Sequence, residues 1–206
     1  NIQAYFKNCF IDGNTDYIFG GGDVLFDACE LSYYGYSNTQ KGAYITAAAD
    51  GSTTGYIFRN CYVSANDAWD VAAGYFGRPW RSSATVAFLN TKLQTKDTVT
   101  AVGWNSMSGA RPEDANYQEY NTTVLGSGAA DVSARTAGTV KNENPYADIV
   151  QTFKGWQPFY FVQETDTAVT VKDIAIEGEL KTGSVLKALY TLSGNEKADA
   201  SVLEWY

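Results

Sequence analysis

The sequence predicts an all-β chain, built as a parallel β-helix over most of its length and followed by a second, smaller β segment. Three observations predict this class. A short pattern that begins with phenylalanine occurs four times in the first half of the chain. The segments around it are rich in the residues that strands favour. The composition then changes near residue 164, where a polar stretch separates the two parts.

The recurring pattern is a phenylalanine, two variable residues, a cysteine or threonine, any residue and then an aliphatic residue. It reads FKNCFI, FDACEL, FRNCYV and FLNTKL, beginning at residues 6, 26, 58 and 88. Repeats at such distances are typical of stacked structural units, each of which buries its apolar face against the next. The repeat therefore favours a solenoid over a β-sandwich, whose short strands need not share a residue pattern.

Strands are predicted around these repeats. Residues 42–47, 55–63 and 84–90 read GAYITA, GYIFRNCYV and ATVAFLN, and they are rich in aromatic and β-branched residues. Turn residues interrupt them, as is typical of short strands. The unequal distances between repeats then correspond to loops of different length that leave the coils.

The three cysteines occupy the same position of the repeat, which predicts that Cys9, Cys29 and Cys61 form one ladder of side chains. Two alternatives remain open for this ladder. Cys9 and Cys29 are one coil apart and form a disulfide, or all three are small buried apolar side chains.

The last third of the chain predicts a helix and then a separate unit. Residues 147–153, ADIVQTF, have apolar residues near helical spacing and are expected to close the end of the solenoid. We assign residues 1–163 to the β-helix and residues 164–206 to a linker and an incomplete β-domain. The chain starts without methionine and stops in a strand-like segment, so we expect it to be a fragment.

Composition excludes several functions. The formal net charge is -8 and the chain has no histidine. An acidic chain is a poor partner for nucleic acid, because binding to phosphates needs basic side chains. Without histidine there is no Ser-His-Asp triad and no Cys-His pair. No apolar stretch has the length of a membrane span, so no membrane insertion is expected. Catalysis must use carboxylates, Arg, Lys, Tyr or amides.

Two short motifs carry the candidate chemistry. GNTDYIFGGG places Asp16 between a turn and a run of large apolar residues, where a lone charge is costly. YFGRPW places Arg78 before a proline that fixes the backbone, and Trp80 offers a flat face for a sugar ring. An arginine can hold a carboxylate through two parallel hydrogen bonds. Each motif alone is also typical of an ordinary surface turn.

Together the motifs resemble the signatures of the pectin methylesterase (pectinesterase) family. GNTDYIFG is similar to the family's Gly-x-Val-Asp-Phe-Ile-Phe-Gly, and YFGRPW to its Leu-Gly-Arg-Pro-Trp. Weaker similarities extend the resemblance to about residue 161. They comprise FKNCFI, AVGWNSM, YQEYNTT and TFKGWQPF.

The resemblance implies a right-handed parallel β-helix that removes methyl esters from polygalacturonate, giving methanol and free acid. It implies that Asp16 is the nucleophile and that Arg78 keeps its carboxylate ionised and aimed. Trp80 is expected to pack against a sugar ring, with Phe19 and Trp104 also lining the cleft. The implied partner is pectin, the implied state is a monomer, and no metal or organic cofactor is expected.

The chain also departs from the family pattern. The family uses a second aspartate, in a Gln-Asp-Thr stretch before the nucleophile, as general acid and base, and glutamines to stabilise the oxyanion. The residues before Asp16 contain no such stretch, so we expect the chain alone to be impaired as an enzyme. Residues 164–206 resemble the first strands of bacterial immunoglobulin-like repeats. This implies a truncated β-sandwich in a bacterial protein that is secreted or held at the cell surface.

Two other functions remain open. The first is a different pectin-acting β-helix enzyme, a lyase or a glycosidase. A glycosidase needs two carboxylates at the scissile bond, and Asp23 and Asp27 are close to Asp16 in sequence. The second is a non-catalytic solenoid that binds carbohydrate or serves in adhesion. Such a protein keeps the aromatic residues but has no need to pair Asp16 with Arg78.

Overall fold

The computed structural model describes residues 2–34, 43–66, 72–157, 170–177 and 187–193. The chain divides into two compact units, Asn1–Gln157 and Pro158–Tyr206. The predicted boundary after residue 163 lies outside the described residues and stays a prediction. Among the residues that the structure describes, no helix is long and apolar enough to cross a membrane.

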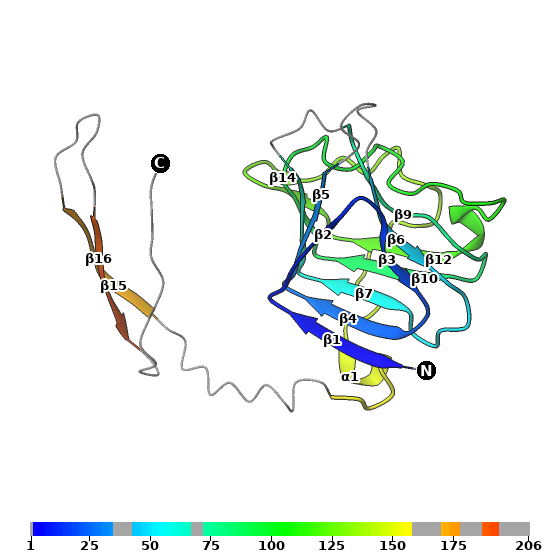
Figure 1. The fold of residues 1–206 in the computed structure, drawn as a ribbon, viewed down its shortest axis with the longest axis horizontal. Coiled ribbons are helices and arrows are strands. Elements are labelled where there is room, and N and C mark those ends of the chain that lie inside the picture. The colour runs from blue at the N-terminus through cyan, green and yellow to red at the C-terminus, as the bar shows by residue number, and fades with distance from the viewer. Residues whose placement is uncertain (1, 35–42, 67–71, 158–169, 178–186, 194–206) are drawn as a thin grey trace. The chain divides into compact units, whose positions relative to one another are not determined.

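The first unit is a parallel β-helix, as predicted (Figure 1). Successive strands fall in turn into three sheets, and each of the first three coils adds one strand to each sheet. Sheet A contains, in order, β1 (Gln3–Lys7), β4 (Asp23–Asp27), β7 (Tyr56–Arg59), β10 (Thr85–Leu89) and β12 (Asn116–Tyr120).

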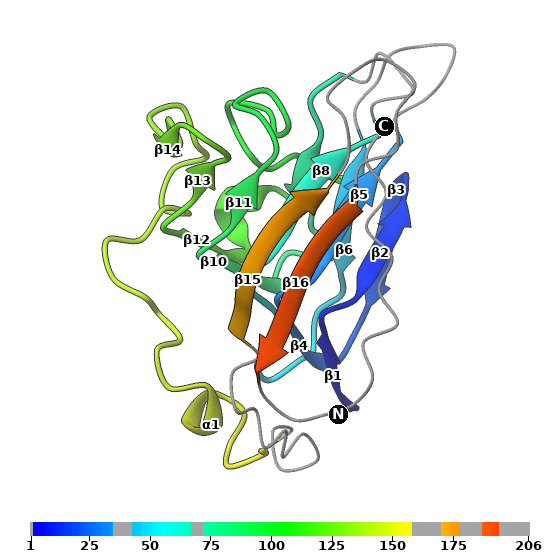
Figure 2. The same ribbon diagram turned by 90° about the vertical axis from the view of Figure 1, so that its left-hand side faces the viewer.

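The other two sheets complete each coil. Sheet B, seen in Figure 2, contains β2 (Phe10–Gly13), β5 (Glu30–Tyr33), β8 (Tyr62–Ala65), β11 (Lys92–Leu93), β13 (Thr123–Val124) and β14 (Gly128–Ala129). Sheet C contains β3 (Thr15–Gly20), β6 (Tyr44–Ala48) and β9 (Tyr75–Gly77). All pairs are parallel except β13 with β14. A short 3-10 helix, η1 (Pro112–Asp114), precedes β12.

The register of sheet A explains the phenylalanine repeat. Phe6, Phe26, Phe58 and Phe88 are directly paired across neighbouring strands. Their rings stack with centroids 5.0, 4.5 and 4.4 Å apart along this series. Each repeat thus contributes one ring to a continuous stack inside the solenoid, and this contact fixes the register between coils.

The cysteines form the predicted ladder. The amide of Glu30 donates to the Cys9 carbonyl, and the amide of Tyr62 donates to the Cys29 carbonyl, which stacks the coils at these positions. Cys9, Cys29 and Cys61 are all free thiols, and the latter two are buried. The structure therefore favours the alternative of small apolar side chains over a disulfide.

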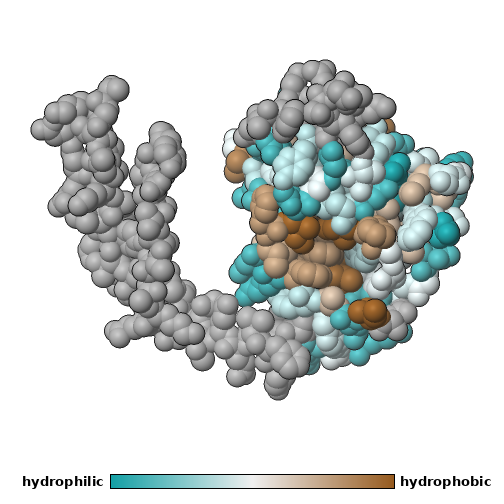
Figure 3. Space-filling model, viewed as in Figure 1, coloured by the Kyte–Doolittle hydropathy of each residue, from teal (hydrophilic) through white to brown (hydrophobic). Residues whose placement is uncertain are grey.

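The first coil is more exposed than the coils that follow. Phe6 and Phe10 are 41% and 64% exposed, whereas Phe26 and Phe58 are 4% and 0% exposed. Figure 3 shows hydrophobic surface in the area that β1, β2 and β3 surround in the same view in Figure 1. The fully buried core therefore begins at the second coil.

The helix predicted at residues 147–153 forms as α1 (Ile149–Thr152), with Asp148 as its N-cap. The expectation that it closes the end of the solenoid is wrong. The Thr54 hydroxyl donates to the Thr152 carbonyl, which places α1 beside the coil of β7, in the middle of sheet A. Residues 139–141 extend sheet A next to β12 instead, through backbone hydrogen bonds with Glu119.

The described part of the second unit is one antiparallel pair, β15 (Thr170–Glu177) and β16 (Lys187–Ser193). The register shifts between Lys172 and Ala175, as at a β-bulge. The immunoglobulin-like assignment concerns mainly residues outside the described ones and stays a prediction.

Candidate active site

Asp16 interrupts the regular strand β3. Its φ angle is 51°, in the left-handed region that few residues other than glycine adopt. The pairing of β3 with β6 shifts between Thr15 and Ile18, on either side of it. Such a conformation costs on the order of 1–3 kcal/mol and tends to occur at functional sites. The bulge frees Asp16 from the alternation of the strand, so its side chain does not have to be buried in the solenoid.

Arg78, directly after β9, holds the Asp16 carboxylate. Nε donates to Oδ1 at 2.9 Å, and Nη2 donates to Oδ2 at 2.7 Å. The Arg78 and Asp16 side chains are 22% and 17% exposed, so the pair is largely withdrawn from water but still reachable. This two-point geometry fixes the direction of the carboxylate.

Gly77 allows β9 to pass close to β6 just before Arg78. A Cβ atom on Gly77 would lie 1.9 Å from Thr46 Oγ1 and 2.7 Å from the Thr46 carbonyl oxygen. The Arg78 amide then donates to that same carbonyl. The glycine of the YFGRPW motif is therefore needed for the strand spacing that brings Arg78 to Asp16.

Phe19 and Trp80, both predicted to contact substrate, lie together on the surface. They are 67% and 37% exposed. Their ring centroids are 6.3 Å apart in an edge-on arrangement. The Trp80 amide donates to the Ala48 carbonyl, so the Trp80 backbone lies beside the end of β6, the central strand of sheet C. The two rings thus form an exposed aromatic pair at the surface.

Trp104 is in a different place from the one predicted. Gly77 and Trp104 form an isolated parallel bridge, which continues sheet C by one position. The indole is 2% exposed and stacks on Tyr117 with centroids 4.2 Å apart. The expectation that Trp104 lines the cleft is therefore corrected, because a buried ring has almost no surface to offer a substrate. Burial and, to a smaller extent, the charge of Asp16 raise the pKa of Tyr117.

Sequence reasoning missed two residues of this site. The Arg78 guanidinium carbon lies 4.1 Å from the centroid of the Tyr44 ring. The Asn105 amide nitrogen donates to the Tyr44 hydroxyl at 3.1 Å. GAYITA was recognised as a strand, but nothing in its composition distinguishes Tyr44 from an ordinary strand tyrosine. Only the pairing of Thr15 with Tyr44 between β3 and β6 places it beside the motif.

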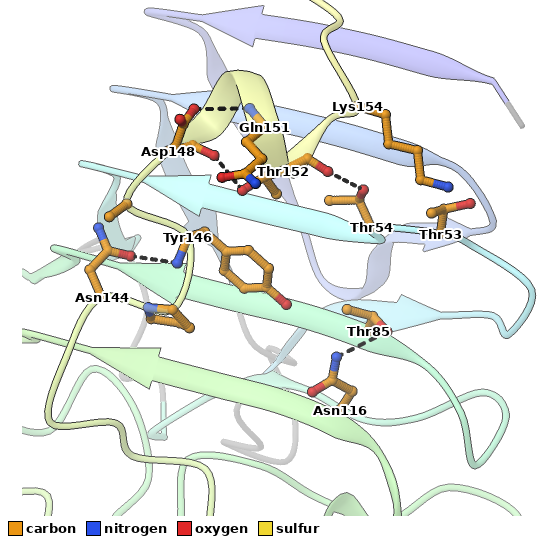
Figure 4. Close-up of a pocket in the computed structure, with 12 residues that line it drawn as sticks. Thr53, Thr54, Thr85, Asn116, Asn144, Tyr146, Asp148, Gln151, Thr152 and Lys154 are labelled. Carbon is orange, nitrogen blue, oxygen red and sulfur yellow. Dashed lines mark hydrogen bonds between the residues drawn. The ribbon is translucent and has the colours of Figure 1, made fainter.

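A separate groove of about 630 Å³ lies on sheet A, beneath α1 (Figure 4). Tyr146 and Asp148 line it from one side, and Thr85 and Asn116 line it from the strands. It includes none of the residues around Asp16. The groove and the Asp16 site therefore lie on different sheets of the solenoid.

The chemistry of the site follows from these contacts. Asp16 is a partly exposed carboxylate that an arginine directs, which makes it a candidate nucleophile or base. Within the described residues, no cluster of three or more His, Cys, Asp or Glu could hold a metal ion. Fold and site together define a class of protein, a parallel β-helix with an arginine-held carboxylate and exposed aromatic rings on one sheet.

Within this class, the chain belongs to the pectinesterase family, whose model matches residues 1–150. It is 38% identical over 138 residues to probable pectinesterase A of Neosartorya fischeri, covering 65% of this chain and 38% of that relative. The pectin methylesterase structure from Aspergillus niger matches with a TM-score of 0.59 at 30% identity, covering 74% of this chain and 47% of that one.

A pectin methylesterase in complex with a hexasaccharide shares the fold, with a TM-score of 0.58 at 23% identity, over 76% of this chain and 52% of that one. The chain spans 38% of the length of the Neosartorya fischeri relative. The two relatives named with their organisms are fungal, so the expected bacterial origin stays a prediction.

Proposed function

We propose that Asp16 is the nucleophile of a pectin methylesterase, which hydrolyses the methyl esters of polygalacturonate to methanol and free carboxylate. The observation that carries this proposal is the two-point ion pair between Asp16 and Arg78. It joins two motifs that are far apart in sequence, on an open sheet, inside the region that matches the pectinesterase family. A carboxylate that only capped a turn would have no need of this arginine.

In the proposed reaction an Asp16 oxygen attacks the ester carbonyl carbon. The C–O bond to the methoxy group breaks, methanol leaves with a proton from a general acid, and an acyl anhydride joins Asp16 to the sugar. Water then attacks the sugar carbonyl of this anhydride and gives one proton to the deprotonated general acid, which restores that acid. The bond to Asp16 breaks, the Asp16 carboxylate is restored, and the galacturonic acid product loses the second proton to solvent. Arg78 keeps Asp16 ionised and aimed before attack and after release.

Proton transfer and oxyanion stabilisation need groups besides this pair. We propose that they come from the second aspartate and the glutamines that the family resemblance assigns to coils before the nucleophile. The chain of residues 1–206 is then expected to release methanol much more slowly than a form that carries those coils. Methanol release from methylated pectin by the two forms measures this difference.

The substrate contacts belong to the same proposal. Phe19 and Trp80 would pack against galacturonate rings, since both are exposed and adjacent. A net charge of -8 would favour highly methylated pectin, which is less anionic. We also propose that the protein is secreted or held at the cell surface and acts as a monomer.

An Asp16→Asn variant tests the nucleophile. We expect its methanol release to fall by about a thousandfold or more, because loss of a nucleophile removes the covalent step. Binding to polygalacturonate is expected to stay within about twofold, since the sugar contacts remain. The matched control is Asp50→Asn, which removes an exposed carboxylate after β6 and should change neither quantity.

Other outcomes favour other functions. Full activity of Asp16→Asn would contradict the nucleophile assignment. Binding to polygalacturonate without methanol release, in the wild type with and without upstream coils, would favour the non-catalytic carbohydrate-binding solenoid. Cleavage of the polymer chain without methanol release would favour a lyase or glycosidase.

A further inference from the structure

Tyr44 lies against the guanidinium group of the Asp16–Arg78 ion pair. The Arg78 guanidinium carbon is 4.1 Å from the centroid of the Tyr44 ring, while Nε and Nη2 of the same group bind the two Asp16 oxygens. These three contacts, two hydrogen bonds and one ring contact, all hold the Arg78 guanidinium. The carboxylate directs two of its N–H bonds, and the aromatic ring covers its carbon.

The ring itself is fixed by its own neighbours. It stacks on Tyr75 with centroids 5.1 Å apart and planes at 11°. The Asn105 side chain donates to its hydroxyl at 3.1 Å, and the Asn105 amide donates to the Gly77 carbonyl, next to Arg78. These contacts join Tyr44, on β6, to β9 and to Asn105. The position of the Tyr44 ring is therefore tied to β9, the strand that leads directly into Arg78.

Strand register explains why this residue has the role. Thr15 pairs with Tyr44, and Tyr44 pairs with Tyr75, so the ring lies in the row next to Asp16. The bulge at Asp16 and the close approach of β9 to β6 at Gly77 fix the backbone positions of the two charged residues. Neither feature restricts rotation of the long Arg78 side chain. A ring on one face of the guanidinium does restrict it, and it also keeps water from that face.

We propose that Tyr44 is a positioning residue that holds Arg78 in the orientation in which it aims the Asp16 carboxylate. It acts through Arg78 and not as a platform for sugar. The role in turnover rests on the proposed esterase function of Asp16, but the arrangement itself can be measured without turnover.

The first test is hydrogen exchange of the Arg78 Nε–H group, followed by nuclear magnetic resonance on the chain of residues 1–206. An Arg78→Lys variant, which has no such group, identifies the signal. We expect slow exchange in the wild type and exchange at least about tenfold faster in Tyr44→Leu. Tyr44→Phe keeps the ring and should stay within about threefold of the wild type. The matched control, Tyr62→Leu on sheet B, should leave the signal unchanged.

The second test is turnover of methylated pectin by the longest natural form of the protein. Tyr44→Leu is expected to lower kcat by about tenfold with little change in KM, and the same change in the Arg78→Lys background should have a much smaller effect. A rise in KM alone, or an equal loss in both backgrounds, would overturn the positioning role in favour of sugar contact or general packing.

The two tests separate the two proposals. If the Nε–H signal behaves as expected but Asp16→Asn keeps full turnover, the proposed function fails and the positioning of Arg78 by Tyr44 stands. If Tyr44→Leu leaves the exchange of the Nε–H group unchanged, or if that group exchanges rapidly in the wild type, the inference about Tyr44 is wrong whatever the enzyme does.

Discussion

Asp16 combines an unusual backbone conformation with a side chain held by one partner. The left-handed φ angle of 51° is costly for a residue with a side chain, and aspartate tolerates it better than most. The ion pair with Arg78 supplies part of the compensation. Because both side chains retain some contact with water, the pair alone is expected to contribute only modestly to stability. Its geometry is therefore better explained by a need to direct a charge than by a need to hold the fold.

Trp80 allows a prediction about binding. Trp80→Ala removes an exposed ring that packs edge-on against Phe19. We expect KM for methylated pectin to rise by about five- to thirtyfold, consistent with losing about 1–2 kcal/mol of ring contact, while kcat changes less than threefold.

Steady-state kinetics of methanol release measure both parameters. Phe10→Ala is the control, since Phe10 is also an exposed aromatic residue but belongs to sheet B. A fall in kcat with unchanged KM would contradict the role of Trp80 in binding and would place it with the residues that act on the reacting group.

At the scale of elements, the end of the phenylalanine stack shows how one coil departs from the repeat. In β12, Glu119 stands where the earlier strands have phenylalanine, directly paired with Phe88. Its side chain is 1% exposed and accepts from Arg135 Nε at 2.8 Å and from the Thr122 hydroxyl at 2.7 Å. Arg135 also donates to the carbonyls of Thr100 and Ala101. A satisfied buried ion pair thus replaces the next ring of the stack.

This arrangement predicts an asymmetry between single and double substitutions. Arg135→Met leaves the Glu119 carboxylate buried without its charge partner, and we expect it to lower the free energy of unfolding by about 3–5 kcal/mol. The double variant Glu119→Leu and Arg135→Met restores apolar contact with Phe88 and should be less destabilised than Arg135→Met alone.

Urea unfolding followed by circular dichroism measures both variants. A loss below about 1 kcal/mol for Arg135→Met would mean that Glu119 gains water or a proton without cost. A double variant less stable than the single one would show that the pair contributes net stability, contrary to the expectation.

The elements that could be predicted are those whose signal is local or periodic. The repeat located the coils, and YFGRPW located Arg78, because both are visible as short runs of residue types. Glu119 and Thr122 in fact continue the repeat, with glutamate in the place of phenylalanine and threonine in the place of cysteine. A search that allowed a polar residue at the stacking position would have found this coil. Tyr44 had no such signal, since its role depends on which strand lies beside it.

At the scale of the whole molecule, the path of the chain after the last coil was the least predictable feature. The helix at Ile149–Thr152 was expected from its apolar spacing, and it forms. Its place beside Thr54 was not expected. The spacing of a few apolar residues predicts which side chains of a helix are buried, but not which coil they pack against. Trp104 was misplaced for a related reason. A Gly-Trp pair looks the same in sequence whether the strand position points its ring inward or outward.

The interior of the β-helix also contains buried tyrosines, which predict how the whole molecule responds to alkali. Tyr33 is 1% exposed, and its hydroxyl donates to the Thr98 carbonyl and accepts from the Gly74 amide. Burial raises the pKa of Tyr33 to about 12, above its value of 10.0 in the unfolded chain. The unfolded chain therefore loses this proton first as the pH rises. The stabilisation is complete below about pH 10 and is lost progressively between about pH 10 and about pH 12.

We therefore expect the free energy of unfolding to fall by about 2–3 kcal/mol across this interval on account of Tyr33 alone, at 1.36 kcal/mol for each pH unit. Tyr5, whose pKa burial and the neighbouring Asp27 raise to about 12, should add a smaller part because it is less buried. Urea unfolding at several pH values, with tyrosinate absorbance followed in parallel, measures the slope. Tyr33→Phe should be less stable than the wild type at pH 8, because the Gly74 amide and the Thr98 carbonyl lose the Tyr33 hydroxyl and keep only their hydrogen bond to each other. The free energy of unfolding of Tyr33→Phe should nevertheless fall less steeply from pH 10 to pH 12 than that of the wild type. An identical decline in the two proteins would mean that the Tyr33 hydroxyl ionises in the folded coil as readily as in the unfolded chain, and that the interior between sheets B and C is open to water.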